Sequence, residues 1–368
     1  CIRDRADAFK NYGSQRTRAG RADMNDMPRF EVDPEALLTI TVGKGQNART
    51  ASRRAAASGE VLVDLVWDEM RLTQDQAERL TQRLVRQRKN ALAKERAPEL
   101  KAEAFLAGDH TLKYLRRDFG QAPEGQKSLW ISMHGGGGAP ARVNDQQWRN
   151  QIKLYTLEEG IYIAPRAPTD TWNLWHQGHI DDLFDRLIET FIATEGVDPN
   201  RVYLLGYSAG GDGVYQLAPR MADRFAAASM MAGHPNNANP TSLRNLPFAI
   251  FMGGEDSAYN RNTVARDWGD RLQKLQAADP EGYPHRCTIY EGLGHWMDGR
   301  DAEGLPWMAQ YTRDPWPTKV VWHQSGRTHG RFAWLSTESP KVTKDKTITA
   351  EVDGQTIRIT KDPLIPYT

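Results

Sequence analysis

The chain has 368 residues, of which 39% are hydrophobic and 11 are tryptophan, enough for one large domain with appendages or for two domains. Its 48 lysines and arginines nearly balance its 47 aspartates and glutamates, and the formal net charge is only +1. This balance gives no global argument for a nucleic-acid partner. No apolar run approaches the roughly 18 residues of a membrane-spanning helix, so we expect a globular protein without a membrane-spanning segment.

The two cysteines are Cys1 and Cys287. Cys287 lies in an apparent strand, and we expect a small buried side chain rather than a reactive thiol. The chain begins at Cys1 without an initiator methionine, and a mature bacterial lipoprotein begins with its lipidated cysteine. We therefore expect an exported protein, whether periplasmic, envelope-anchored or extracellular, in preference to a cytoplasmic one. The alternative is that the chain was trimmed here, and whether Cys1 is a lipidation site stays open.

Residues 1–105 are rich in charge, and we expect a helical N-terminal extension. Asp33 is a suitable N-cap residue, and Pro34 would then occupy the first helical position. The stretch "TQDQ" at 73–76 resembles a capping box and precedes apolar residues at helical spacing. Both patterns predict the start of a helix.

A basic run follows at residues 83–96, "RLVRQRKNALAKER". It could bind nucleic acid, but it contains no interleaved aromatic residues, and we interpret it as the solvated face of a helix. Pro98 can open a further short helix that Gly108 closes. We therefore expect this part of the chain to be helical, and its role stays open.

Residues 106–317 alternate strand-like and helix-like segments, which predicts one catalytic domain. The apolar strand-like segments are 129–133, 160–165, 201–205, 226–231, 247–252 and 287–290. Helical patterns lie between them at 180–195 and near 261–277. Such alternation is typical of an α/β fold with a doubly wound, mostly parallel sheet, in which ligands bind at the carboxyl ends of the strands.

Residues 318–368 change character. The segments "KVVWHQ", "RFAWLS", "TITAEV" and "TIRIT" predict short alternating strands, and "DGQ" at 353–355 predicts a hairpin turn. We expect a small antiparallel β-unit that packs on the main domain and is structural.

The stretch "GYSAGG" at 206–211 follows a buried strand and precedes a helical pattern. This is the context of a G-x-S-x-G turn, which holds a serine in a strained, open conformation. Ser208 is therefore a candidate nucleophile. The less favoured alternative for the stretch on its own is a glycine-rich helix entry with an incidental serine.

The stretch "HGGGG" at 134–138 follows an earlier strand, so a doubly wound sheet brings it to the same edge as Ser208. Glycines let backbone N–H groups face a ligand without steric screening. We expect the N–H groups of Gly135, Gly136 and Ala209 to form an oxyanion hole. The alternative for this stretch on its own is a flexible loop.

Asp256 follows the strand "PFAIFM", and His295 follows the strand "CTIY". The chain order Ser208, Asp256, His295 is the order of an α/β-hydrolase triad. His295 would take the proton of Ser208, and Asp256 would fix the tautomer of the imidazole. Glu255 stands beside Asp256, but we favour Asp256, which has the shorter side chain and fewer rotamers to restrict.

On these residues, the segment 106–315 resembles the α/β-hydrolase superfamily, in particular the esterase branch that includes polyhydroxybutyrate depolymerases, feruloyl esterases and phospholipase/carboxylesterase-type hydrolases. The resemblance rests on the glycine loop 134–138, the turn 206–210, Asp256 and His295. It implies ester hydrolysis by a serine nucleophile without a cofactor. It covers little of either flanking region.

Other residues follow strand ends and are candidate substrate contacts. They are His134, Trp172, Trp175, His234 and Trp296. The two tryptophans of the "TWNLWHQGH" stretch could form an apolar or sugar-stacking wall, or pack over the end of a helix. His176 and His179 have the spacing of two metal ligands on a helix, but no Glu or Cys completes a site, and we assign no metal.

Three hypotheses for the function stand at this point. The first is a serine hydrolase that cleaves a small or polymer-derived carboxylic ester through an acyl-enzyme. The second is a serine peptidase with the same triad, and the third is a binding protein that retains the fold without catalysis. The sequence does not predict the acyl group, the alcohol or the oligomeric state.

Overall fold

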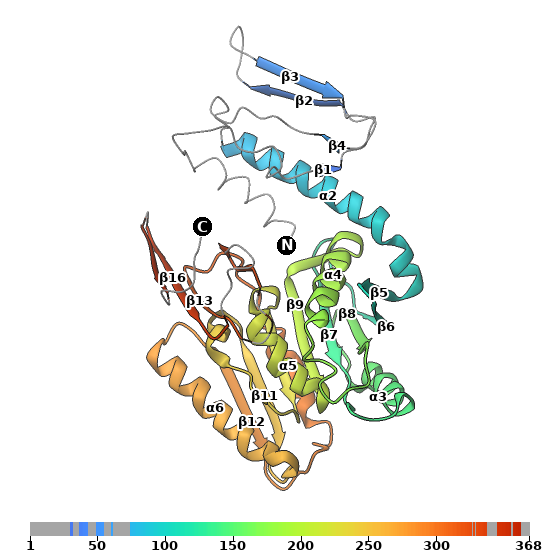
Figure 1. Ribbon diagram of the computed structural model, residues 1–368, viewed down its shortest axis with the longest axis vertical. Coiled ribbons are helices and arrows are strands. Elements are labelled where there is room, and N and C mark those ends of the chain that lie inside the picture. The colour runs from blue at the N-terminus through green and yellow to red at the C-terminus, as the bar shows by residue number, and fades with distance from the viewer. Residues whose placement is uncertain are drawn as a thin grey trace. The chain divides into compact units, whose positions relative to one another are not determined.

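The computed structural model describes the backbone of four short N-terminal strands and then a nearly continuous chain from residue 74 (Figure 1). The described residues are 30–31, 37–42, 49–54, 60–61, 74–325, 327, 329–336, 344–354 and 356–361. By their internal contacts, residues 1–96 and 97–368 form two compact units. All the predicted site residues fall in the second unit.

The first unit contains two pairs of antiparallel strands. β1 (Phe30–Glu31) pairs with β4 (Glu60–Val61), and β2 (Leu37–Val42) pairs with β3 (Arg49–Arg54). The predicted helix starting at Pro34 is therefore wrong over the residues of β2. These read "LLTITV", and the branched side chains of threonine, isoleucine and valine favour a pleated strand over a helix.

The helix predicted from the capping-box pattern is confirmed as α2 (Gln74–Ala102). Pro98 lies inside α2, so the predicted break there is wrong. A proline near the end of a long helix removes one backbone hydrogen bond, and the turns before it can still form. Gly108 does not close a helix either; it has a φ of +57° in the turn between two strands.

Eight strands form the central sheet of the second unit, in the order β12-β11-β10-β9-β7-β8-β6-β5. Their bounds are β5 (Ala104–Ala107), β6 (His110–Phe119), β7 (Lys127–Met133), β8 (Gly160–Arg166), β9 (Val197–Tyr207), β10 (Ala227–Met231), β11 (Phe248–Gly253) and β12 (His285–Tyr290). β6 is antiparallel to both its neighbours, and all pairs from β8 to β12 are parallel. This mostly parallel sheet confirms the predicted fold class.

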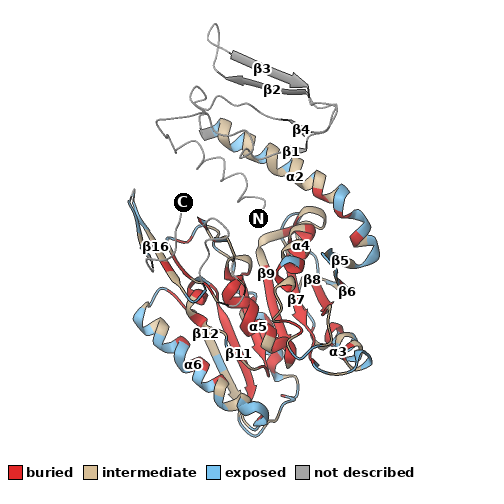
Figure 2. Ribbon diagram, in the orientation of Figure 1, coloured by how far each residue is buried: buried red, intermediate tan, exposed pale blue. Residues whose placement is uncertain are grey.

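Helices connect the parallel strands and cover the sheet. They are α3 (Ala141–Leu154), α4 (His179–Thr194), α5 (Ala209–Arg220) and α6 (Arg261–Ala278), with the shorter α7 (Gly304–Met308) and the 3₁₀ turns η4 (Ala222–Arg224), η5 (Pro240–Asn245), η6 (Ala258–Asn260) and η7 (Arg300–Glu303). Because helices cover the sheet, β10 and β11 are buried along their whole length (Figure 2). Among the described residues, no helix is long and apolar enough to cross a membrane.

The C-terminal residues form the predicted small antiparallel sheet, in the order β13-β16-β17. Its strands are β13 (Lys319–His323), β16 (Thr347–Asp353) and β17 (Thr356–Lys361). The segment "RFAWLS", predicted as one strand, is instead a hairpin of β14 (Arg331–Phe332) and β15 (Leu335–Ser336). The chain turns at Ala333, whose φ of +51° interrupts the extended backbone.

The structure tests the prediction for one of the two cysteines. Cys1 lies outside the described residues. Cys287 is exposed, so its predicted burial is wrong, because β12 is the edge strand of the sheet and has a neighbour on one side only. Its Sγ atom nevertheless faces the backbone oxygen of Ala265 in α6, and desolvation raises the pKa of the thiol, which disfavours the reactive thiolate.

Candidate active site

Ser208 occupies a sharp turn between β9 and α5, with φ of 58° and ψ of −121°. The turn requires glycine on both sides. A Cβ at Gly206 would lie 2.3 Å from the oxygen of Gly210, and a Cβ at Gly210 would lie 2.0 Å from the oxygen of Met133. The backbone N–H of Ser208 donates to the oxygen of Met231 at 2.9 Å, which fixes the strained residue at the end of the sheet.

Ser208, His295 and Asp256 form a hydrogen-bonded chain. The Oγ of Ser208 lies 3.0 Å from Nε2 of His295, and Nδ1 of His295 lies 2.6 Å from Oδ2 of Asp256. The Asp256 side chain is only 2% exposed, whereas that of His295 is 43% exposed. The structure therefore brings together the three residues that the sequence pattern singled out, with the acid buried and the base open to solvent.

The loop after β11 places Asp256 and Glu255 on opposite sides. Asp256 is buried against His295, and Nη1 of Arg261 lies 3.7 Å from its second carboxylate oxygen. Glu255 is exposed. Its backbone N–H donates to the oxygen of Leu293 at 2.9 Å, which ties the acid loop to the loop that carries His295.

Tyr207, which the sequence analysis passed over, holds that loop from the other side. Its hydroxyl donates to the backbone oxygen of His295 at 2.7 Å and accepts from the N–H of Met297 at 3.2 Å. Its ring meets the His295 ring edge-on, with 5.9 Å between centroids. The signal in the sequence was its place directly before Ser208, at the last position of a buried strand.

Residues 134–138, which we call the oxyanion loop after their predicted role, lie against the turn that carries Ser208. A Cβ at Gly135 would lie 3.1 Å from the Cβ of Ser208, and Gly136 has a φ of +113° that favours glycine. The backbone N–H of Ala209 is the first of α5, and such groups have no partner within their own helix. Gly135 and Ala209 thus lie beside Ser208, and Gly136 is the next residue of the same loop.

Asn144 of α3, another residue that the sequence analysis missed, clamps this loop. Its Oδ1 accepts from the N–H of Gly137 at 3.0 Å, and its Nδ2 donates to the oxygen of Ala139 at 3.2 Å and to Asp170 at 2.8 Å. Asn144 is fully buried. Its amide therefore satisfies loop groups that would otherwise lose their hydrogen bonds on burial.

His134 was predicted to contact substrate, and the structure places it elsewhere. Its ring is 0% exposed, and its Nε2 accepts from the N–H of Ala167 at 3.1 Å. Nδ1 therefore carries the proton and donates to the oxygen of Gly135 at 2.6 Å. Burial lowers the pKa of His134 to about 4, so the ring is neutral. With no exposed surface and both nitrogens bonded, it shapes the oxyanion loop from within.

Trp175 is also fully buried and cannot line a substrate pocket, contrary to prediction. Its Nε1 donates to the backbone oxygen of His134 at 2.9 Å. Trp172, in contrast, is 64% exposed, and its backbone packs against Gly137 and Gly138 of the oxyanion loop. Of these two tryptophans, only Trp172 is left as a candidate substrate contact.

Trp296 and His234 remain candidate substrate contacts. Trp296 follows His295 directly and is 54% exposed, with its ring 5.7 Å from that of Tyr207. His234 follows β10, and its backbone N–H donates to Oδ1 of Asp212 at 2.6 Å. Asp212 lies four residues after Ser208 on α5, and burial raises the pKa of its carboxyl to about 6.

His176 and His179 do not converge on a common point. The His179 ring stacks on that of His110 at 3.6 Å, whereas the His176 ring meets the Trp172 ring edge-on, with 5.4 Å between centroids. Within the described parts of the chain, no group of three His, Cys, Asp or Glu side chains is placed to hold a metal ion.

The fold and the site point to one superfamily. The candidate nucleophile lies at the turn after the fifth strand of an eight-stranded sheet with a single antiparallel member, and the acid and the histidine follow later strands in that order. A model of the dienelactone hydrolase family matches residues 158–322. The chain has the α/β-hydrolase fold.

Two kinds of relatives accompany this match. The chain is 25% identical over 215 residues to the bifunctional acetylxylan esterase/xylanase of Neocallimastix patriciarum, an alignment that covers 50% of this chain and 31% of that protein. The chain therefore spans about a third of that relative's length. Among solved structures, a thermostable esterase is 18% identical with a TM-score of 0.43, covering 57% of this chain and 62% of that one. Thermogutta terrifontis esterase 2 phosphorylated by paraoxon is 17% identical with a TM-score of 0.41, covering 56% and 89%.

Proposed function

We propose that the protein is a serine hydrolase that cleaves carboxylic esters through an acyl-enzyme. The observation that carries the proposal is the chain of hydrogen bonds from Ser208 through His295 to Asp256, on a strained turn that faces a glycine loop. A serine hydroxyl needs a base within hydrogen-bond reach to become a nucleophile, and here Nε2 of His295 is 3.0 Å away. The descriptions of the matching family and of the curated relative, both ester hydrolases, support the same reaction class.

In the first half of the reaction, Nε2 of His295 accepts the proton of Ser208 while Oγ attacks the ester carbonyl carbon. The carbonyl oxygen becomes an oxyanion, which we assign to the backbone N–H groups of Gly135, Gly136 and Ala209. The ester C–O bond then breaks, and the imidazolium gives its proton to the departing alcohol. Asp256 stabilises the imidazolium without itself taking the proton.

In the second half, a water molecule gives its proton to His295 and attacks the acyl group on Ser208. The oxyanion forms again at the same N–H groups, and the carboxylic acid leaves as Ser208 recovers its proton. His295 is open to solvent in the structure, so water can reach the ring that must activate it. No cofactor enters either half of this scheme.

The surroundings of Ser208 favour a substrate with flat rings or an extended chain, such as a small aromatic ester or a polymer-derived ester. Three exposed aromatic residues stand on three different loops that follow β8, β11 and β12: Trp172, Tyr259 and Trp296. Exposed rings of this kind offer stacking faces. The segment between β10 and β11 is short, so it does not supply a large lid.

The proposal is tested by turnover of a p-nitrophenyl ester. A reaction through an acyl-enzyme with slow hydrolysis releases a burst of p-nitrophenol equal to the active sites, followed by a slower steady rate. We expect this behaviour from the wild-type protein and none from Ser208→Ala. Cleavage of peptide p-nitroanilides in preference to esters would support the peptidase instead, and turnover by Ser208→Ala would reject the proposed mechanism.

A further inference from the structure

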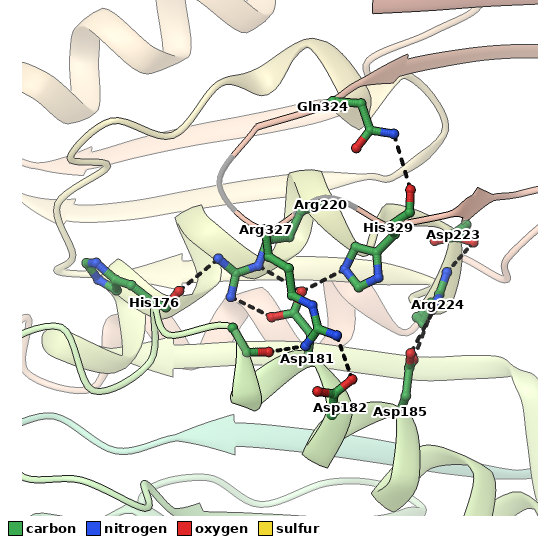
Figure 3. Close-up of polar contacts among 11 residues, drawn as sticks. His176, Asp181, Asp182, Asp185, Arg220, Asp223, Arg224, Gln324, Arg327 and His329 are labelled. Carbon is green, nitrogen blue, oxygen red and sulfur yellow. Dashed lines mark hydrogen bonds and ion pairs between the residues drawn. The ribbon is translucent and has the colours of Figure 1, made fainter. Parts of the chain in front are cut away.

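A buried charged cluster joins the C-terminal β-unit to the catalytic domain. Asp181, in the first turn of α4, is 0% exposed. Arg220 of α5 donates two hydrogen bonds to its carboxylate, at 2.6 and 3.0 Å, and Nε2 of His329 lies 2.7 Å from the same carboxylate (Figure 3). Burial alone would raise the pKa of Asp181, but Arg220 and His329 outweigh it, and the net shift is downward. The carboxylate is therefore ionised and fully partnered.

The same cluster holds the segment 171–178, hereafter the buttress loop. Nη1 of Arg220 donates to the backbone oxygen of His176 at 2.9 Å. Arg327 donates to the backbone oxygen of Gly178 and, at 2.7 Å, to the carboxylate of Asp182 (Figure 3). The buttress loop is thus bonded both to α5 and to residues of the C-terminal β-unit.

The other side of the buttress loop supports the oxyanion loop. Nε1 of Trp175 donates to the oxygen of His134 at 2.9 Å, and the two rings meet edge-on at 5.1 Å. A Cβ at Gly137 would lie 3.3 Å from the oxygen of Trp172, so the two backbones are in close contact. A shift of the buttress loop must therefore move the N–H groups that we assign to the oxyanion hole.

We propose that His329 and Arg327 are positioning residues, which hold the buttress loop and through it the oxyanion loop in the geometry that the reaction needs. This inference rests on the proposed ester hydrolysis. It assigns the C-terminal β-unit a part in the chemistry, where the sequence predicts only a structural appendage.

The charge balance of the cluster makes the inference testable. Arg220 alone already neutralises Asp181 and bonds both of its oxygens, so loss of His329 leaves no unpaired buried charge. What His329 adds is a second, directional hydrogen bond to Asp181, three residues after the end of the buttress loop. A small misplacement of this kind, about 1 Å, can cost up to roughly 10²-fold in rate while substrate binding survives.

The test compares His329→Ala with the wild-type enzyme on p-nitrophenyl acetate. We expect kcat to fall by about tenfold or more, with little change in KM, because the oxyanion exists only in the transition state. A boronic acid inhibitor, which forms a tetrahedral adduct on the serine, should lose affinity in parallel with kcat. His329→Gln keeps a side-chain N–H donor and should restore most of the activity.

His323→Ala is the matched control. His323 belongs to the same β-unit, and its ring bonds to Thr347 at 2.9 Å and to Asn239 at 3.2 Å. If the C-terminal unit acts through stability alone, His323→Ala and His329→Ala should lower activity in proportion to their loss of melting temperature. The inference instead expects a fall in kcat for His329→Ala that His323→Ala does not show.

Arg327→Ala serves where His329→Ala fails to fold, because the pair of Arg327 with Asp182 is partly exposed and contributes little to stability. Exposed Arg331 supplies its control, Arg331→Ala. An unchanged kcat in every folded variant at His329 and Arg327 would overturn the inference. Labelling of wild-type Ser208 by a fluorophosphonate separates this result from a failure of the proposed function, in which the label itself would be absent.

Discussion

Two loops of the molecule each carry a histidine, and the two histidines differ in their burial and in the groups to which they bond. The oxyanion loop follows β7 and the loop of His295 follows β12, two parallel strands whose carboxyl ends face the same edge of the sheet. Both loops contain glycines. His134 is nevertheless buried and neutral, with both nitrogens bonded to backbone, whereas His295 is exposed and bonded to two side chains.

The difference lies in the hydrogen-bond partners of each imidazole ring. Backbone partners on both sides of His134 fix a loop and leave no nitrogen for chemistry. A carboxylate on one side of His295 and a hydroxyl on the other make a base that can take and return a proton. A histidine after a strand end is therefore assigned by its partners and its burial, which the sequence pattern does not reveal.

The largest effect on kcat is expected at Ser208, the first residue of the hydrogen-bonded chain that runs through His295 to Asp256. Ser208→Ala should lower kcat on the order of 10⁶-fold, because the nucleophile and its base act as a unit. His295→Ala should cost nearly as much, and the double variant little more than either single one. Steady-state kinetics on a p-nitrophenyl ester measures all three, and additive losses would show that the two residues act independently.

The second-largest effect on kcat is expected at Asp256, and the neighbouring Glu255 tests whether Asp256 is the acid. Asp256→Asn should keep the fold and lower kcat by roughly 10⁴-fold, because the imidazole then loses the partner that sets its tautomer. Glu255→Gln, an exposed matched control, should change kcat by less than about tenfold, or under 1.4 kcal/mol of barrier. The reverse order of the two variants would mean that the acid is misassigned.

A smaller fall in kcat is expected when the oxyanion loop loses a hydrogen bond that holds it in place. Asn144→Ala removes the clamp on the N–H of Gly137 and should lower kcat on the order of 10²-fold, the scale of losing one oxyanion donor. Gln146→Ala, an exposed change on the same helix, is the control and should leave kcat unaltered. Equal kinetics of the two variants would contradict the assignment of this loop to the oxyanion.

The last effect concerns the pH dependence of stability rather than the rate. The pKa of His134 falls from 6.5 to about 4 on burial, so between these values the unfolded chain binds a proton that the folded chain refuses. The contribution of His134 to stability is therefore fully present above pH 6.5 and is lost as the pH falls toward 4, by about 3 kcal/mol. His176, whose pKa is also lowered to about 4 by burial, adds to the same slope.

Urea unfolding of His134→Asn between about pH 4 and pH 6.5 checks this prediction, because the variant should have a visibly flatter pH dependence than the wild type. A slope that survives in His134→Asn would mean that the ring is not neutral in the folded state.

The parallel strands and the loops at their ends were predictable, because each buried strand is a short apolar run that stops at glycine or at a polar residue. The pair β5 and β6 was not predicted. Along β6 the exposed Lys113 alternates with the buried Leu112 and Tyr114, and charges at outward positions obscure an apolar face that only the pairing with β8 reveals. Local sequence carries no record of that long-range partner.

The same limit applies to the site. Glycine spacing and chain order locate Ser208, Asp256 and His295, because the turn and the triad order are properties of the sequence. The burial of His134 and Trp175 depends on how the buttress loop passes beneath the oxyanion loop, a contact between segments about forty residues apart. Such packing leaves no pattern in the local sequence. Both residues were therefore wrongly predicted to contact substrate.

The central claim is that Ser208 is a nucleophile activated by His295, and covalent labelling tests it most directly. The protein is treated with a fluorophosphonate, and the adduct is located by mass spectrometry of its peptides. The account predicts a single adduct on Ser208 that forms far more slowly in His295→Ala. An adduct on another residue, or an undiminished rate in His295→Ala, would contradict it.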